Sequence, residues 1–339
     1  MIQIRFTGCV LSPAVLRRDT PNGIPQPSHF TRQCQAAARS FVVPIHYISR
    51  ESSTRIVLTV PELPDLIYIR SYLEKSLPGR TVTAVDVKQP VLVRNMLDEP
   101  LERALGGRSF AAVGGRGPFL RLAMAGDVEL IINLMLAGRL QHMRRGEKPL
   151  GYLGLALALD DGTSLRLCDE KKMAKLYAAR GADTDGIPRY ATQGIDILSP
   201  GFTREKFGEI LAANSRRQVR VMVNDQETLS AIGNAYADEI LFEARIHPKT
   251  FTGRLSPEER DRLYDAIGSV MAWGTRMVRE AAEPIHVKVR EHLKVRNRRG
   301  EPCPRCGTTI RREGVRGHDT FFCPSCQPPS RKLFIDWRV

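Results

Sequence analysis

Four cysteines near the C-terminus place the strongest constraint on how this chain folds. The stretch CPRCGTTIRREGVRGHDTFFCPSC holds two Cys-x2-Cys pairs separated by sixteen residues, formed by Cys303, Cys306, Cys323 and Cys326. Each pair turns two thiolates toward one point, and two such pairs supply the tetrahedral sulfur ligands that zinc prefers. The alternative is two disulfides, which is disfavoured because no secretion signal is recognised. We therefore predict a zinc finger over residues 290–330 with one structural Zn2+.

The positive charge of the chain is concentrated toward its two ends. Of a formal net charge of +14, residues 288–339 hold thirteen Lys and Arg against five acidic residues, and residues 1–60 hold seven Arg against two. A basic terminal segment favours a polyanionic partner such as nucleic acid, although a solvated surface would also account for it. No apolar run reaches the ~18 residues of a membrane helix, so we expect no membrane partner and a cytoplasmic protein.

The spacing of apolar residues divides the chain into parts. Residues 1–60 are rich in Pro, Ser and Gln and show no sustained period. Residues 61–190 begin with a helical period and continue with strand patterns such as TVTAVDVK, FLRLAMAG and VELIIN, and with the hairpin LGLALALDDGTSLRLCD. Residues 200–287 change to helical periods, and the last of these helices starts with a capping box of Ser256 and Glu259. These patterns predict a mainly β domain followed by a helical one.

Two short motifs stand in front of predicted helices. The sequence PELP at 61–64 precedes an amphipathic helix, and AIGN at 231–234 forms a turn between two helices. A glycine-containing turn lets backbone N–H groups and an asparagine side chain approach a phosphate closely, although such a turn is often a plain connection. The basic finger that follows favours the phosphate-binding interpretation.

The two motifs and the terminal finger resemble one family. PELPD before a helix, IGNAYADEILFEARIHP and the four-cysteine finger occur in the order found in the formamidopyrimidine-DNA glycosylase and endonuclease VIII family, over residues 61–327. The resemblance implies an α+β fold: an N-terminal β-sandwich with a leading helix, a helix–two-turn–helix domain and a zinc finger. It also implies a DNA glycosylase that excises oxidised bases and cuts double-stranded DNA at the abasic site, acting as a monomer.

The resemblance gives PELP a chemical role. The family's proline is the mature N-terminus, so Pro61 would attack the anomeric carbon of the damaged nucleotide and form an iminium ion, with Glu62 as acid and base. With Val60 attached, however, the nitrogen of Pro61 is an amide without a usable lone pair. We therefore expect the working protein to begin at Pro61. Residues 1–60 would then be an over-extended reading frame, with Val60 read from a GTG start codon, or else a removed leader.

Other residues are assigned to DNA binding by the resemblance. Asn234 matches the family's phosphate-binding asparagine, and Arg220 lies where a basic residue contacts DNA. Leu136 occupies the usual position of a methionine wedge that fills the gap left by a flipped base. Lys171 and Met173 stand where an arginine and a phenylalanine are expected. Each of these last three residues could equally belong to the core.

Two cationic contacts of the family are altered in this chain. Pro118 stands in place of a strand lysine that holds phosphate near the proline, and His318 in place of the finger's arginine. Charge-assisted hydrogen bonds contribute roughly 1.5–3 kcal/mol each, so these changes would weaken catalysis unless Arg116 and Arg316 compensate. The alternative function is a lesion- or abasic-DNA-binding relative with little catalysis. An unrelated zinc-ribbon protein would leave PELP unexplained.

Overall fold

The computed structural model describes residues 60–149 and 151–329. The expectation for residues 1–60 therefore lies, apart from Val60, outside the described residues. Among the described residues, no helix is both long and apolar enough to span a membrane.

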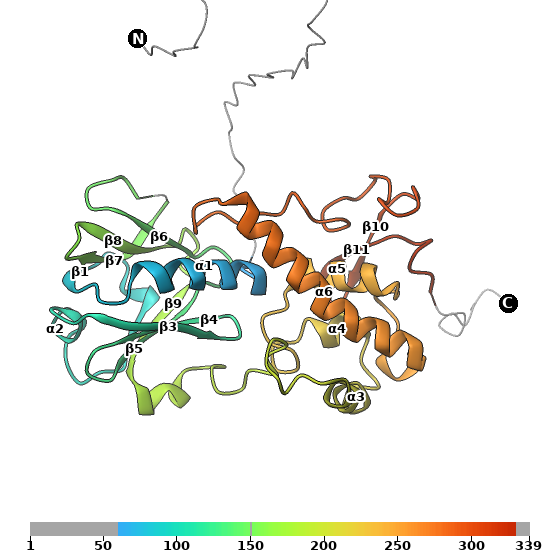
Figure 1. The fold of residues 1–339 in the computed structure, drawn as a ribbon, viewed down its shortest axis with the longest axis horizontal. Coiled ribbons are helices and arrows are strands. Elements are labelled where there is room, and N and C mark those ends of the chain that lie inside the picture. The colour runs from blue at the N-terminus through green and yellow to red at the C-terminus, as the bar shows by residue number, and fades with distance from the viewer. Residues whose placement is uncertain (1–59, 150, 330–339) are drawn as a thin grey trace, which may run out of the picture. The chain divides into compact units, whose positions relative to one another are not determined.

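Two β-sheets form the N-terminal part (Figure 1). The five-stranded sheet has the order β2 (Val93–Asn95), β9 (Lys175–Arg180), β5 (Val128–Asn133), β4 (Phe119–Met124) and β3 (Phe110–Arg116). The four-stranded sheet has the order β1 (Val82–Val87), β7 (Leu153–Leu159), β8 (Thr163–Cys168) and β6 (Arg139–Arg144). Neighbouring strands are antiparallel except β2 and β9. The predicted strands and the β7–β8 hairpin are confirmed.

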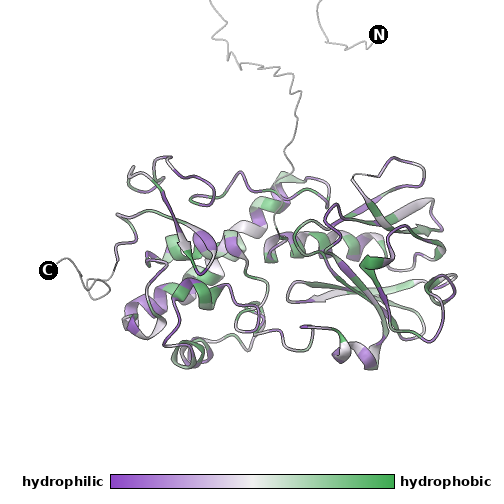
Figure 2. Cartoon of the chain, turned by 180° about the vertical axis from the view of Figure 1, so that it is seen from behind, coloured by the Kyte–Doolittle hydropathy of each residue, from purple (hydrophilic) through white to green (hydrophobic). Residues whose placement is uncertain are grey.

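Helix α1 (Leu63–Ser76) contributes its apolar face to the core of this part. Leu66, Ile69, Leu73 and Leu77 recur at helical spacing, are at most 4% exposed and belong to one cluster with residues of both sheets. Figure 2 shows hydrophobic and hydrophilic residues together on the strands, as expected for sheets that bury one face against such a core. Burying the leucine side chains contributes roughly 1.5–3 kcal/mol each, so α1 is fixed by packing.

The remaining short elements of the N-terminal part connect strands. They are η1 (Pro90–Leu92), α2 (Leu101–Leu105) and η2 (Gly181–Gly186). Residues 181–203 then lead into the helical part without a strand. The predicted boundaries at residues 190 and 200 stay predictions.

The second part is helical, as predicted. It contains α3 (Arg204–Ala213), α4 (Val219–Val223), α5 (Asn234–Ala244), η3 (Thr252–Arg254) and α6 (Pro257–Ala281). The predicted capping box of α6 is present: the backbone N–H of Glu259 donates to Ser256 Oγ over 3.2 Å, and the N–H of Ser256 donates to Glu259 Oε2 over 3.0 Å. Helices α5 and α6 pack against each other, and α6 also contacts α1.

The C-terminal finger folds against α5. Its hairpin consists of β10 (Arg311–Val315) and β11 (His318–Phe322), joined by a turn at residues 316–317. Ile310 and Phe321 form a small cluster with Phe242 of α5. The side-chain amide of Gln327, which is fully buried, donates to the carbonyl of Ile246 over 2.9 Å. The finger and the helical part therefore share a core.

A buried carboxylate on α5 joins the finger to the helical part. Asp238 accepts hydrogen bonds from Arg220 Nε at 3.0 Å, from Thr320 Oγ1 at 2.6 Å and from Arg296 NH1 at 2.8 Å. The backbone N–H of Phe321 donates to the same carboxylate over 3.2 Å. Asp238 and Arg220 are each 1% exposed, so the charge of one is balanced by the other in the interior.

We predict that Asp238→Ala strongly destabilises the protein. The variant leaves the buried guanidinium of Arg220 without its carboxylate, which costs roughly 3–5 kcal/mol. Urea unfolding measures the effect. Asp261→Ala is the matched control, because Asp261 forms an exposed pair with Arg204 that contributes at most about 1 kcal/mol. Equal losses in the two variants would contradict the prediction.

Candidate active site and DNA interface

Glu62 connects the start of α1 with the start of α5. Its Oε2 accepts the backbone N–H groups of Gly233 at 3.1 Å and Tyr236 at 2.9 Å, and its Oε1 accepts that of Ala235 at 2.9 Å. The first N–H groups of a helix have no partner within the helix, so they favour an anionic acceptor at this place. The backbone N–H of Leu63 also donates to Ala231 O over 2.9 Å. PELP and AIGN are thus in direct contact.

Burial and the groups around Glu62 act on its pKa in opposite directions. Burial raises the pKa of Glu62 above its ordinary value, while the charge of Arg290 and the N–H groups of Tyr236 and Ala235 lower it in part. A Cβ at Gly233 would lie only 2.5–2.7 Å from atoms of Glu62. The glycine of the turn is therefore required by the close approach of the carboxylate.

A second acidic residue on α1 supports the same corner. Asp65 Oδ2 accepts the backbone N–H of Glu62 at 2.8 Å. Arg290 binds Asp65 with both terminal nitrogens, NH1 to Oδ1 at 2.9 Å and NH2 to Oδ2 at 2.6 Å. Burial lowers the pKa of Arg290, but the charge and hydrogen bonds of Asp65 outweigh it, so the guanidinium stays charged. Nothing in the sequence pairs residues 225 positions apart, and this contact was not predicted.

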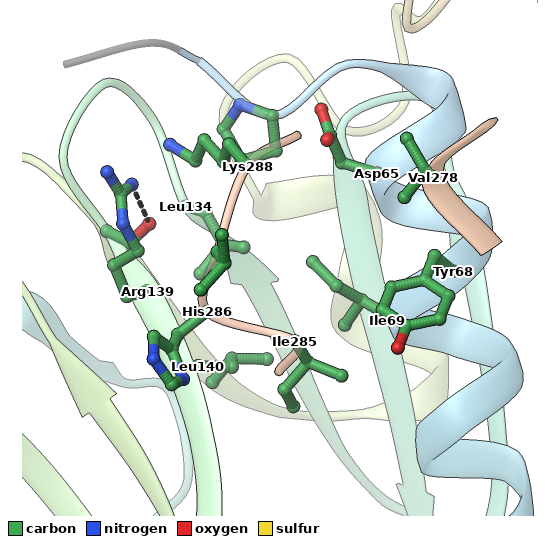
Figure 3. A pocket seen from close by; sticks show the side chains of 13 residues that line it. Asp65, Tyr68, Ile69, Leu134, Arg139, Leu140, Val278, Ile285, His286 and Lys288 are labelled. Carbon is green, nitrogen blue, oxygen red and sulfur yellow. Dashed lines mark hydrogen bonds between the residues drawn. The ribbon is translucent and has the colours of Figure 1, made fainter. Parts of the chain in front are cut away.

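Pro61 lines a narrow pocket (Figure 3). The pocket is bounded by α1, by the start of β6 and by the segment that follows α6. The polar residues lining it are Asp65, Tyr68, Arg139, His286 and Lys288. Sequence reasoning singled out Pro61 here. It missed Arg139 on β6 and Lys288 after α6, because only tertiary packing brings them to the pocket.

Asn234 and Arg220 lie together, as their assignment to one interface requires. Asn234 is the first residue of α5, and its Oδ1 accepts hydrogen bonds from Arg220 NH2 at 3.0 Å and from Asn224 Nδ2 at 3.3 Å. Asn234 is partly exposed, whereas Arg220 is buried and also donates to the carbonyl of Asp319 at 2.9 Å. Asn234 is therefore the more accessible of the two, and the DNA-binding role of each stays a prediction.

The proposed wedge residues differ in exposure. Lys171 and Met173 are exposed, which excludes a core role for both, and Leu136 is half-buried. The buried carboxylate of Asp169 orders their loop by accepting the backbone N–H groups of Lys171 and Met173, each at 2.8 Å. Met135, beside Leu136, is 37% exposed with a φ of +49°. Its exposure makes it a further wedge candidate that the sequence reasoning missed.

Arg116 is not one of the described residues that line the pocket of Pro61. Its NH2 donates to the carbonyl of Ala191 at 2.9 Å, and its guanidinium lies 5.7 Å from the centre of the Tyr190 ring. Pro118 follows it in the turn between β3 and β4. The structure therefore gives Arg116 a partner in the loop before the helical part.

Arg316 and His318 both lie exposed at the tip of the finger hairpin. Arg316 has a φ of +47°, so the turn places it at the bend itself. Because the two side chains occupy one turn, either can reach a phosphate that approaches the tip.

The four cysteine sulfurs of the finger fit a zinc ion. All lie within 4.8 Å of one another. The Sγ atoms of Cys303 and Cys326 are 3.9 Å apart and those of Cys306 and Cys323 3.5 Å apart. Zn–S bonds of ~2.3 Å in a tetrahedron place sulfurs about 3.8 Å apart, whereas a disulfide needs ~2.05 Å. These spacings favour zinc over the disulfide alternative.

A two-sheet part, a helical part whose turn meets PELP, and a four-cysteine finger define the class of zinc-finger DNA glycosylases. Family models match each part in turn: the formamidopyrimidine-DNA glycosylase N-terminal domain at residues 60–176, its H2TH domain at 194–283, and the zinc finger found in FPG and IleRS at 300–329.

Curated relatives cover the same region. The formamidopyrimidine-DNA glycosylase of Pelotomaculum thermopropionicum is 30% identical over 274 residues, which is 79% of this chain and 99% of the relative. That of Heliobacterium modesticaldum is 32% identical over 277 residues, 79% of this chain and 100% of the relative. This chain therefore belongs to the formamidopyrimidine-DNA glycosylase family.

The fold agrees with solved structures. A complex of Lactococcus lactis Fpg with DNA containing an abasic site matches with a TM-score of 0.72 and 24% identity, covering 79% of this chain and all of that chain. The Lactococcus lactis complex with DNA containing FAPY-dG matches with a TM-score of 0.71, 24% identity and the same coverage. The predicted family, fold and zinc finger are confirmed.

We predict that zinc removal abolishes DNA binding. A four-cysteine site usually supplies the folding free energy of so small a module, so strong chelation or Cys323→Ser should unfold the finger while the two sheets stay folded. Elemental analysis and a DNA-binding titration measure this together. Cys168→Ser is the control, because Cys168 lies in β8, outside the finger, where its Sγ donates a hydrogen bond to Gln141 Oε1. Zinc-free protein that still binds DNA would defeat the prediction.

Proposed function

We propose that this protein is a base-excision-repair glycosylase that removes oxidised bases from double-stranded DNA and cleaves the strand at the abasic site, acting as a monomer in the cytoplasm. The contact between Glu62 and the N-terminus of α5 carries the proposal. It brings a proline that can act as an amine together with a carboxyl group and a phosphate-binding turn. The relatives' names and the DNA bound in the solved complexes support it.

The chemistry follows from the residues at this corner. The nitrogen of Pro61 attacks C1′ of the damaged nucleotide, and the base leaves as a proton is supplied to the sugar or base. The resulting iminium acidifies C2′, so that loss of its proton expels the 3′-phosphate. Glu62 supplies and accepts these protons, which its raised pKa favours.

DNA is held by the surfaces that surround this corner. We assign phosphate contacts to Asn234 at the start of α5 and to Arg316 and His318 at the finger tip. We assign the filling of the space left by the extruded nucleotide to side chains that face the DNA strand. These are the exposed Lys171, Met173 and Met135, together with Leu136. Arg220 positions Asn234 through the bond between Arg220 NH2 and Asn234 Oδ1.

We predict that an adduct at Pro61 forms only when the chain begins there. A protein made as Met-Pro61 loses its methionine and exposes a secondary amine, whereas Val60 makes the same nitrogen an amide. Borohydride reduction with abasic-site DNA, followed by peptide mass spectrometry, locates the adduct.

The matched control is the Pro61-starting protein with its terminus acetylated, which should form no adduct at Pro61. Finding an adduct on the Pro61 nitrogen in a chain that retains Val60 is chemically excluded. If the Pro61-starting protein binds abasic DNA but forms no adduct, the result would favour the alternative function, a DNA-binding relative with little catalysis.

We predict that Pro118→Lys raises strand cleavage and steepens the salt dependence of DNA binding. A lysine at this turn adds roughly one phosphate contact, which increases the slope of log K against log salt by about 0.9. Titrations at several salt concentrations measure the slope. Pro118→Gln is the control, because it changes the turn without adding charge. Equal slopes for the two variants would show that the position does not reach the DNA.

A further inference from the structure

A second amine lines the pocket that contains Pro61. Lys288 belongs to the segment after α6 and is the only lysine among the described residues that line this pocket. Figure 3 shows its side chain on the side of the pocket that also holds Arg139. Its Nζ donates to the carbonyl of Leu136 at 3.4 Å, a long and therefore weak hydrogen bond.

Burial and the neighbouring arginines favour the neutral form of Lys288. Burial, followed by the charge of Arg139 on β6 and that of Arg290, lowers its pKa to about 7, while Asp65 on α1 and Asp169 oppose the shift. Asp65 is already bound by both terminal nitrogens of Arg290, which reduces what it offers to the lysine. At neutral pH this lowered pKa makes the unprotonated amine accessible.

An amine here does not depend on where the chain begins. The nitrogen of Pro61 is a nucleophile only without Val60, whereas the side chain of Lys288 is a primary amine in either case. The aldehyde of an open abasic sugar is small and reacts with primary amines without activation by a base. Both residues line the same pocket.

We propose that Lys288 is a second nucleophile of this site, which forms a Schiff base with the open-chain aldehyde of an abasic nucleotide. The inference rests on the proposed function, because it requires abasic DNA to bind at the corner of Pro61. It adds lyase activity that survives when the N-terminal amine is blocked, and it does not extend to base removal.

The bonds balance without any further reactant. The Nζ–C1′ bond forms, and the aldehyde oxygen leaves as water. The C2′ proton passes to a base, and the C3′–O bond breaks as the phosphate departs with its electron pair. Water then hydrolyses the imine and returns Lys288. His286 lines the same pocket, and burial, followed by Arg139, lowers its pKa, so a neutral imidazole is present to accept the C2′ proton.

The test uses the chain from Met1, shown by intact mass to retain Val60. It is reduced with borohydride in the presence of abasic-site DNA, and the adduct is mapped by peptide mass spectrometry. We expect the nucleotide on Lys288. Lys288→Arg keeps the charge but removes the nucleophile, and should lower the adduct yield at least about tenfold. Lys88→Arg is the matched control, since Lys88 lies exposed beside Asp86 and should leave the yield unchanged.

Three results would overturn the inference: an adduct mapped to another lysine, an unchanged yield in Lys288→Arg, or no adduct in the chain that retains Val60. The mapping of the unsubstituted chain does not depend on how any variant folds. A Pro61-starting protein analysed in parallel separates the two ideas. An adduct at Pro61 there, with none on Lys288 in the longer chain, overturns this inference alone. No adduct in either protein overturns the proposed enzyme function as well.

Discussion

The carboxylate of Glu62 is the interaction on which the arrangement of the parts depends. It is 4% exposed and accepts three backbone N–H groups at the start of α5, so a side chain of the sheet-bearing part completes a helix of the other part. An uncompensated helix terminus and an unpaired buried carboxylate would each be unfavourable, and the contact removes both costs. The residue to which we assign proton transfer is therefore also the one that holds the two parts together.

Helix α5 extends this coupling to the finger. Asp238 binds Arg220, Arg296 and the β11 strand, and the neighbouring Glu239 accepts the backbone N–H groups of residues 294–296 at 2.9–3.0 Å. Glu239 is 1% exposed, and burial raises its pKa while the three N–H groups lower it. Two adjacent acids thus fix the segment that enters the finger. The motif that reads as a phosphate-binding turn is also the structural centre of the molecule.

The sequence predicted the parts that local spacing encodes. The cysteine spacing indicated the finger, the capping box at Ser256 indicated the start of α6, and the Asp-Asp-Gly turn indicated the β7–β8 hairpin, because each depends on residues close in the chain. It could not indicate the Asp65–Arg290 pair or the placement of Lys288, which depend on tertiary packing. For the same reason Arg220 was assigned to DNA without notice of its buried partner Asp238. Whether a residue is buried depends on the fold and cannot be inferred from the type of that residue.

Pro118 stands where the family has a strand lysine, and the contacts around it show where the basic side chains of this chain lie instead. Pro118 supplies no charge at the β3–β4 turn, and Arg116 beside it is engaged with Ala191 and Tyr190. The basic side chains at the pocket of Pro61 are instead Arg139 on β6 and Lys288, whose pKa is lowered to about 7. The segment that carries Lys288 continues to residues 294–296, which Glu239 fixes. Arg139 is held by its sheet, whereas Lys288 belongs to a segment anchored between α5 and the finger. The electrostatics of the pocket therefore depend on the folded finger, so that loss of zinc would disturb the catalytic corner as well as the DNA contacts.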